Sequence, residues 1–192
     1  MSKILYVVDN NEKTDYKYNI CEDTVIYHFG INSSSTVCIN LVTEGVTLHY
    51  YYNNINYDEN EFKIEINHLV GNTHSEVYNH GVNVLDSKLT YYVTGKVNKE
   101  SSSCICNQDN QIINMADGKS TILPILLIDN YDVDSNHSAY IGKFRDDEIF
   151  YLMSRGISRI EANRLLLNGF LINMDSIDLS KIEVFKNEIE KI

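Results

Sequence analysis

Long hydrophobic runs are missing from this chain of 192 residues. A membrane-spanning helix needs about 20 consecutive apolar residues, so we expect no such helix here. The amino-terminal sequence MSKILYVVDNNEK is apolar only briefly, and Asp9 and Glu12 fall where a secretory signal peptide is still hydrophobic. We therefore expect a cytoplasmic protein that does not associate with a membrane.

Positive charge is scarce as well. Lys and Arg number 16 against 27 Asp and Glu, which gives a formal net charge of -11. Such a chain repels phosphate backbones, so nucleic acid is not expected as a ligand and a basic protein partner is favoured. The cysteines have no disulfide-scaffold spacing, and we expect them to be reduced thiols. They are Cys21, Cys38, Cys104 and Cys106.

Sequence motifs of catalysis are also absent. The chain has no G-x-S-x-G elbow, P-loop, dinucleotide fingerprint or HExxH motif. Acidic pairs such as Asp132 with Asp134 stand where turns and helix caps need them. A carbohydrate-active β-helix enzyme would need carboxylates clustered on one exposed sheet face, and the sequence shows no such run. We expect a protein that is not an enzyme.

Short strand-like segments dominate residues 24–144. They are rich in Val, Ile, Thr, Tyr and Phe, are separated by Asn, Gly, Asp or Ser, and have no helical segment between them. This pattern indicates either an antiparallel sandwich or a solenoid of stacked sheets, although no fixed-length repeat is visible. Residues 72–81 are polar, and we predict a loop or a less regular coil there, with a second loop at residues 98–103. The predicted strands are TVIYHFGI, STVCINLV, GVTLHYYY, EFKIEINHL, KLTYYVTGKV, SSCICN, QIINMA, STILPILLID and SAYIGKF.

After Gly142 the period of the pattern changes from that of strands to that of helices. Asp146 or Asp147 is predicted to cap a short helix that runs through Ser154, and Gly156 provides its left-handed stop. A second helix follows directly, which makes a helical hairpin.

Two capping boxes are predicted beyond that stop, Ser158 with Glu161 and Ser180 with Glu183, and they begin the second and the last helix. The predicted buried face of the second helix contains Ile160, Leu167 and Leu171, with Ala162, Leu166 and Phe170 beside it.

Three of the four arginines, Arg155, Arg159 and Arg164, lie in this hairpin, and Arg145 precedes it. Guanidinium groups are planar, bidentate donors suited to partner recognition, so the cluster indicates a docking surface. The alternative is a solvated helix face on which Arg164 pairs with Glu161 or Asn168.

Two patterns have metal-ligand chemistry. Cys104 and Cys106 share one face if they lie on a strand, and His68, His74 and His80 recur every six residues with Glu76 among them. The alternatives are two small side chains on one strand face, and polar residues of a loop.

Residues 124–142, PILLIDNYDVDSNHSAYIG, are followed by IFYLMSRGIS, EANRLL and GFL. In order and spacing these motifs resemble the C-terminal signature of the SufB/SufD family of iron-sulfur cluster assembly proteins. That signature is a proline-led strand, a V-x-x-x-H-x-A turn, an isoleucine-glycine step, FYLxSRGI and EAxxLLxxGF. Weaker similarity to the family's core extends upstream through His68, Thr73 and Gly81.

The resemblance implies a right-handed parallel β-helix in residues 1–144 and a C-terminal α-helical subdomain in residues 145–192. The helical subdomain of such proteins docks SufC, an ABC-type ATPase, and the last strands of the β-helix pair with a SufB-like subunit or a second copy. The SufC-docking residues implied by the match are Tyr151, Ser154, Arg155, Gly156, Ile157 and Ala162.

Pro124 and His137 match the family's subunit-pairing surface. The corresponding histidine lies where the nascent cluster is assembled, and imidazole can ligate iron, so His137 is a candidate metal ligand, with Cys106 as a second candidate. The resemblance implies no stably bound cofactor, a transient iron-sulfur cluster, and ATP on the SufC partner only.

Two departures from the family pattern bear on function. Family members are usually more than twice as long, and Asp109 stands where the SufB branch has a cluster-associated cysteine. The resemblance therefore implies a shortened SufD-like member, a non-catalytic scaffold that couples SufC to cluster assembly. The alternative is a binding or regulatory module that has kept the fold and lost the cluster site.

Overall fold

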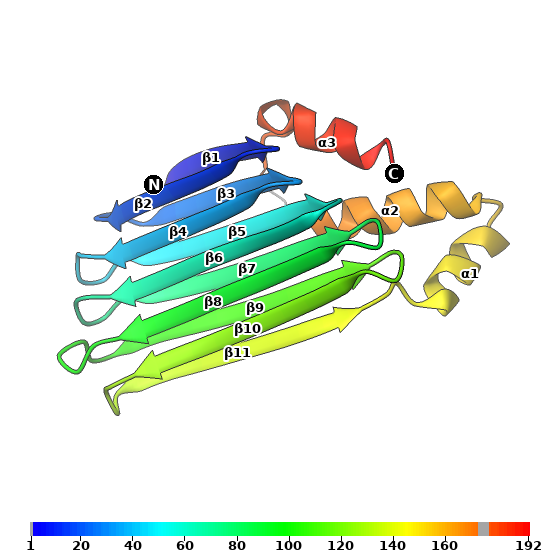
Figure 1. Cartoon of the computed structure of the whole chain (residues 1–192). Coiled ribbons are helices and arrows are strands. Elements are labelled where there is room, and N and C mark those ends of the chain that lie inside the picture. Colours follow the sequence, from blue (N-terminus) through cyan, green and yellow to red (C-terminus); the bar gives the residue numbers. More distant parts are fainter. Residues whose placement is uncertain (1, 173–176) are drawn as a thin grey trace.

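Parallel strands wind into a β-helix in the computed structural model of the protein, which describes residues 2–172 and 177–192 (Figure 1). The odd-numbered strands form a six-stranded sheet in the order β1-β3-β5-β7-β9-β11, and the even-numbered strands form a five-stranded sheet in the order β10-β8-β6-β4-β2. The expected parallel β-helix is confirmed, and the sandwich alternative is wrong. The strands are β1 (Lys3–Asn10), β2 (Lys13–Ile20), β3 (Thr24–Ile31), β4 (Ser34–Leu41), β5 (Thr47–Asn56), β6 (Glu59–His68), β7 (His74–Asn83), β8 (Lys88–Val97), β9 (Cys104–Asn114), β10 (Lys119–Ile128) and β11 (Val133–Gly142).

Coils of unequal length explain why no fixed repeat is visible in the sequence. Tyr6, Tyr27, Tyr51 and Tyr78 are register partners on successive odd-numbered strands, although they lie 21, 24 and 27 residues apart along the chain. Longer corners and longer strands together account for the difference. Asn11, Asn32 and Asn72 occupy such corners with φ of 53°, 45° and 54°, a region that Asn adopts more readily than most residues.

The lumen between the two sheets is filled by the inward-facing side chains of each strand. Tyr50, Tyr52, Phe62 and Tyr91 are fully buried there, and the rings of Tyr52 and Phe62 stack with centroids 3.6 Å apart. Full burial of a large apolar side chain contributes about 1.5–3 kcal/mol, so this row supplies much of the stability of the fold.

Two predictions along the strands are wrong. Residues 72–81 were predicted as a loop or a less regular coil, but most of them form the regular strand β7, because inward Ser75 and Asn79 have hydrogen-bond partners in the lumen: His68 and Asn110. Residues 104–114 form the single strand β9, where two strands were predicted. Strands β1 and β2 precede the predicted strand region, whereas the loop at 98–103 is confirmed.

The helices follow the β-helix and cover part of its six-stranded sheet (Figure 1). Side chains of α2 and α3 form one hydrophobic cluster with outward residues of that sheet, including Phe29, whose ring lies 4.8 Å from that of Phe185. Helix α1 lies beyond the sheet and packs mainly on α2. The helices are α1 (Asp146–Ser154), α2 (Arg159–Leu171), the 3-10 turn η1 (Leu179–Lys181) and α3 (Glu183–Ile189).

The predicted boundaries hold at the end of α1 and the start of α2 and fail at two other helix starts. The predicted cap of α1 at Asp146 or Asp147 is wrong, because Arg145 is the N-cap residue and has no side-chain cap hydrogen bond. Gly156 has φ of 87° after α1, and Ser158 and Glu161 form the predicted capping box of α2. The box at Ser180 is wrong, because Asp178 caps η1 and α3 begins without a side-chain cap. Ile160, predicted to be buried, is exposed. No helix within the described residues has the length and apolar character needed to cross a membrane.

Candidate functional site

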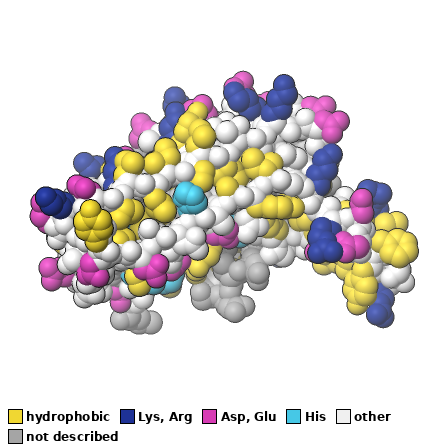
Figure 2. Space-filling model, turned by 90° about the horizontal axis from the view of Figure 1, so that it is seen from below, with side chains coloured by type: hydrophobic (Ala, Val, Ile, Leu, Met, Phe, Trp, Pro, Cys, Tyr) yellow, Lys and Arg dark blue, Asp and Glu magenta, His cyan; other side chains and the backbone are white. Residues whose placement is uncertain are grey.

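The last coil of the β-helix, β10 and β11, is its open end. Each strand is the edge of its sheet and has one strand neighbour in the part of the chain that the structure describes. Strand β10 is apolar on both faces, and the outward Leu123, Ile125 and Leu127 are 42%, 42% and 52% exposed. Figure 2 views the molecule from this side, and hydrophobic side chains gather across it. An unpaired apolar edge is a template for pairing with another chain.

Pro124 and His137 lie on the two edge strands of this coil. Their register partners are Val93 and Gln108, whose side chains are buried in the lumen. Because side chains alternate along a strand, Pro124 and His137 stand on the lumen side of the open end. Proline has no N–H to donate, which suits an edge strand. The structure thus brings both predicted pairing residues to one end, and their role stays a prediction.

Cys106 and Asp109 stand on opposite faces of β9. Cys106 is buried in the lumen and pairs in register with Ser135, so it shares a side with His137. Burial raises the pKa of the Cys106 thiol to about 11, which keeps it protonated and a poor metal ligand in this state. Asp109 faces outward and accepts a hydrogen bond from Ser138. No group of three or more His, Cys, Asp or Glu side chains among the described residues is arranged to hold a metal ion.

The three histidines of the predicted metal pattern do not meet. His68 faces the lumen, where its ring nitrogens lie 2.7 Å from the Thr73 hydroxyl and 2.9 Å from that of Ser75. Burial lowers the pKa of His68 to about 4, so it is neutral. His74 and His80 face outward near opposite ends of β7. His68 lies on β6 of the other sheet, and six residues of β7 separate His74 from His80, so the metal pattern suggested by their even spacing is wrong.

The hairpin of α1 and α2 presents an apolar, arginine-bearing surface. Phe150 is 74% exposed, and the Arg155 guanidinium lies over the ring of Tyr151, 5.3 Å from its centroid. Of the predicted docking residues, Ala162 is fully buried and can act only through packing. The others are accessible: Tyr151, Ser154, Arg155 and Gly156 are exposed and Ile157 is half-buried. The exposed apolar residues of the hairpin are Phe150, Tyr151, Met153, Ile160 and Leu165.

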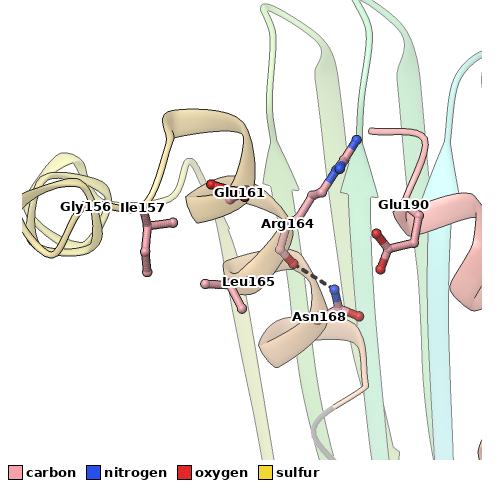
Figure 3. Close-up of a pocket in the computed structure, with 7 residues that line it drawn as sticks. All are labelled: Gly156, Ile157, Glu161, Arg164, Leu165, Asn168 and Glu190. Atoms are coloured by element: carbon pink, nitrogen blue, oxygen red, sulfur yellow. Dashed lines mark hydrogen bonds between the residues drawn. The ribbon is translucent and has the colours of Figure 1, made fainter.

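A groove of about 600 Å³ separates α2 from the end of α3 (Figure 3). Arg164 extends along it between Glu161 and Glu190, and within the described residues its guanidinium has no carboxylate close enough for an ion pair. Asn168 donates to the Arg164 backbone carbonyl at 2.9 Å and not to the side chain. The predicted alternative of a helix face with internally paired arginines therefore does not describe Arg164.

Sequence reasoning missed a buried polar network in the first coil. Asp9 Oδ2 lies 2.8 Å from His28 Nε2 and 2.5 Å from the Ser35 hydroxyl, and Tyr16 donates to Oδ1 at 2.5 Å. Burial alone would raise the pKa of Asp9, but these hydrogen bonds, with that of His28 the strongest, lower it below its usual value. The signal in the sequence was a single aspartate, Asp9, at the end of an apolar run, and an aspartate at that place is also typical of a turn.

Comparisons with known proteins agree with the fold and the motifs. Residues 32–170, more than two thirds of the chain, match the SufBD core domain of the SUF system for FeS cluster assembly. SufD of Bacillus subtilis is 32% identical over 111 residues, which cover 57% of this chain and 25% of that protein. SufB of the same organism is 31% identical over 106 residues, 54% of this chain and 23% of SufB.

An iron-sulfur cluster assembly SufBD family protein of Pyrococcus horikoshii is 42% identical over 62 residues, 32% of this chain and 13% of that protein. The matched segment thus spans a quarter or less of the length of each of these relatives. The match to the core domain, the β-helix and the motifs of its last coil and hairpin agree: the chain belongs to the SufB/SufD family of the SUF system.

Proposed function

We propose that the chain is a non-catalytic scaffold subunit of a Suf-type complex that assembles iron-sulfur clusters. In this proposal the hairpin binds a SufC-like ABC ATPase, and the last coil pairs with a SufB-like subunit or with a second copy of the chain. A cluster forms transiently beside His137, and ATP is bound by the SufC-like partner only.

The observation that carries the proposal is the pair of unpartnered surfaces at one end of the molecule. The apolar edge of β10 and the exposed apolar face of the hairpin both lie where the family match is strongest in motif detail. The two surfaces differ in charge, so they suit different partners. Arg155 and Arg159 on the hairpin suit a partner that offers carboxylates, whereas the edge of β10 suits another strand.

The connection between the two surfaces suggests how ATP acts. Only residues 143–145 separate the end of β11 from α1, so movement of the hairpin is passed to the last coil. Closure of an ATP-bound SufC-like dimer would draw two docked hairpins together. The paired β-helices would then open at their shared edge and expose His137.

The test is co-purification with the SufC-like ATPase. We expect Arg155→Glu to abolish binding with the circular dichroism spectrum unchanged, because the guanidinium is exposed on the hairpin surface. The matched control is Lys17→Glu, the same reversal of charge at an exposed position of β2. Retention of the ATPase by Arg155→Glu, or equal loss in both variants, contradicts the proposed docking.

A second function is favoured by the chemistry at β9. Asp109 replaces the cysteine of the SufB branch, and the Cys106 thiol is buried and protonated. A binding or regulatory module that keeps both interaction surfaces and holds no cluster accounts for these two residues.

Anaerobic reconstitution with iron, sulfide and a SufB-like partner separates the two functions. The scaffold proposal predicts cluster absorbance that falls in His137→Ala while pairing is kept. Equal absorbance with and without His137 removes the assignment of this residue, and no absorbance in either protein favours the regulatory module.

A further inference from the structure

A cavity of about 300 Å³ lies between the outer face of the six-stranded sheet and the end of α2. It is on the opposite sheet face from His137, and neither the docking nor the pairing proposed above depends on it. Three rings and a helical glycine enclose three polar side chains. The lining residues are Tyr51, Asn53, Tyr78, His80, Asp109, Gly169 and Phe170.

His80 is held in one orientation inside this cavity. Its Nδ1 lies 3.1 Å from the Phe170 backbone carbonyl, and its ring stacks on that of Phe170 with centroids 4.7 Å apart. A carbonyl oxygen only accepts, so Nδ1 carries the proton. The other nitrogen, Nε2, is buried and has no hydrogen-bond partner. An imidazole whose far nitrogen is anchored on a carbonyl is the usual arrangement of a metal-binding histidine.

Asp109 faces that bare nitrogen. Its Oδ2 lies 3.7 Å from His80 Nε2, which is too long for a hydrogen bond. The gap is close to the separation of two ligands that share one ion at bond lengths of about 2.0–2.2 Å. The Asp109 carboxylate is oriented by hydrogen bonds that it accepts from Ser138 and Gln111.

Asn53 supplies a third polar group. It is the register partner of His80 on β5, it is 2% exposed, and its Nδ2 is buried without a partner. A half-turn of the amide about its terminal bond places the carbonyl oxygen at that position. Two buried polar atoms without hydrogen-bond partners, on His80 and Asn53, then line the same cavity as the Asp109 carboxylate.

We propose that this cavity binds a first-row divalent transition-metal ion through His80 Nε2, the Asp109 carboxylate and the Asn53 amide oxygen. Imidazole nitrogen with carboxylate and amide oxygens suits Zn²⁺, Fe²⁺ or Co²⁺, and the space toward Gly169 leaves positions for water or a further ligand.

A second histidine-carboxylate pair on the same sheet face shows the contrast. His74 Nε2 lies 2.6 Å from Glu76 Oε1, so these two groups satisfy each other directly, with no gap for an ion. His80 and Asp109 are separated by a gap, whereas His74 and Glu76 are in direct contact. His74 therefore provides a matched control.

The experiment is a titration of the untagged, chelator-treated chain with Co²⁺, followed by visible absorbance, and with Zn²⁺ by calorimetry. We expect binding at one site, weakened by roughly tenfold or more in Asp109→Asn and in His80→Phe, which keeps the ring stack on Phe170. We expect His74→Gln to bind as the unchanged protein does. No saturable binding, or binding lost equally in His74→Gln, overturns the proposal.

Nitrogen NMR of the His80 ring in the unchanged, metal-free protein gives a readout that does not depend on a variant folding. The proposal requires the neutral tautomer with the proton on Nδ1 at pH 7, and a shift of the Nε2 resonance when Zn²⁺ is added. A ring protonated on both nitrogens, paired to Asp109 through water, overturns it.

Discussion

The two ends of the β-helix are built differently. In the first coil, the buried Asp9 carboxylate is hydrogen-bonded to His28 on the neighbouring strand β3, and the Tyr6 hydroxyl on the β1 edge accepts from the Asp178 backbone N–H at 2.9 Å. In the last coil, β10 and β11 have no such cover among the described residues, and apolar side chains are exposed along β10. Strands β1 and β2 are edges too, so the two ends differ in the contact made by Tyr6 and in the apolar row exposed along β10. We therefore expect the last coil to be the end that binds a partner.

Thiol reactivity is the largest expected effect, and it measures how closed the lumen is beside the last coil. Cys106 has its pKa raised to about 11 by burial, whereas Cys21 is exposed. At pH 8 the fraction of thiolate at Cys106 is therefore smaller by about two orders of magnitude than at an ordinary cysteine. We expect a thiol reagent, followed by peptide mass spectrometry, to modify Cys21 first and Cys106 only on unfolding. Rapid modification of Cys106 in the native protein would show that the lumen is open there.

Charge on the edge of β10 is expected to weaken pairing strongly. Leu127→Glu places a carboxylate where another strand would pack, and we expect association with a SufB-like subunit or a second copy to fall by roughly 30-fold or more. Analytical ultracentrifugation measures this. The control is Val8→Glu, at an exposed apolar position on the β1 edge of the first coil. Similar losses in both variants would mean that the two ends are not distinct in function.

Loss of the buried carboxylate is expected to destabilise the first coil. Asp9→Asn leaves His28 without its charged partner, and we expect the free energy of unfolding to fall by about 3 kcal/mol at pH 7, measured by urea denaturation. Asp15→Asn, at an exposed position of β2, is the control and should change little.

The difference in the free energy of unfolding between the unchanged protein and Asp9→Asn depends on pH, because the pKa of Asp9 is lowered in the folded state. A carboxyl whose pKa is lower in the folded than in the unfolded state stabilises the fold above its unfolded value of about 3.9, and this contribution is lost as the pH falls below that value. The gap between the unchanged protein and Asp9→Asn should therefore be constant from pH 5 to 7 and shrink below about pH 4. A gap that widens on acidification contradicts the described network.

The smallest effect concerns the hairpin that leaves the last coil. Gly156 has φ of 87°, so Gly156→Ala should destabilise the hairpin by about 1 kcal/mol. Gly169 lies inside α2, and a Cβ there would meet nothing within 4 Å, so Gly169→Ala should stabilise by up to about 1 kcal/mol. Opposite signs in thermal denaturation confirm the left-handed stop, whereas equal signs contradict it.

Local patterns predicted the turn between α1 and α2 but not the caps of α1 and α3, and prediction failed for strands whose stability depends on neighbouring strands. The capping box at Ser158 and the stop at Gly156 are set by a few adjacent residues. The polar strand β7 resembled a loop, because its inward Ser75 and Asn79 are stabilised by partners on other elements. Those partnerships require knowledge of the register.

Predictions about the candidate site met the same limit. The family resemblance predicted one pairing surface for His137 and Pro124; the structure places them on the two strands of the last coil, and their role stays a prediction. Spacing alone could not bring His80 to Asp109, since the two lie 29 residues apart in the chain and meet only because β7 and β9 are neighbours. Nor could it show that Ala162 is buried while Tyr151 is exposed, because that depends on how α1 packs on α2.

Hydrogen exchange in the presence of a SufB-like subunit tests most directly whether the last coil is the pairing end. We expect the amides of residues 119–142 to become protected when the subunit is added, with residues 3–20 unchanged, because the exposed apolar row of Leu123, Ile125 and Leu127 lies on β10. Protection of residues 3–20 in place of 119–142 would contradict the account, and so would the absence of new protection at a saturating concentration of the subunit.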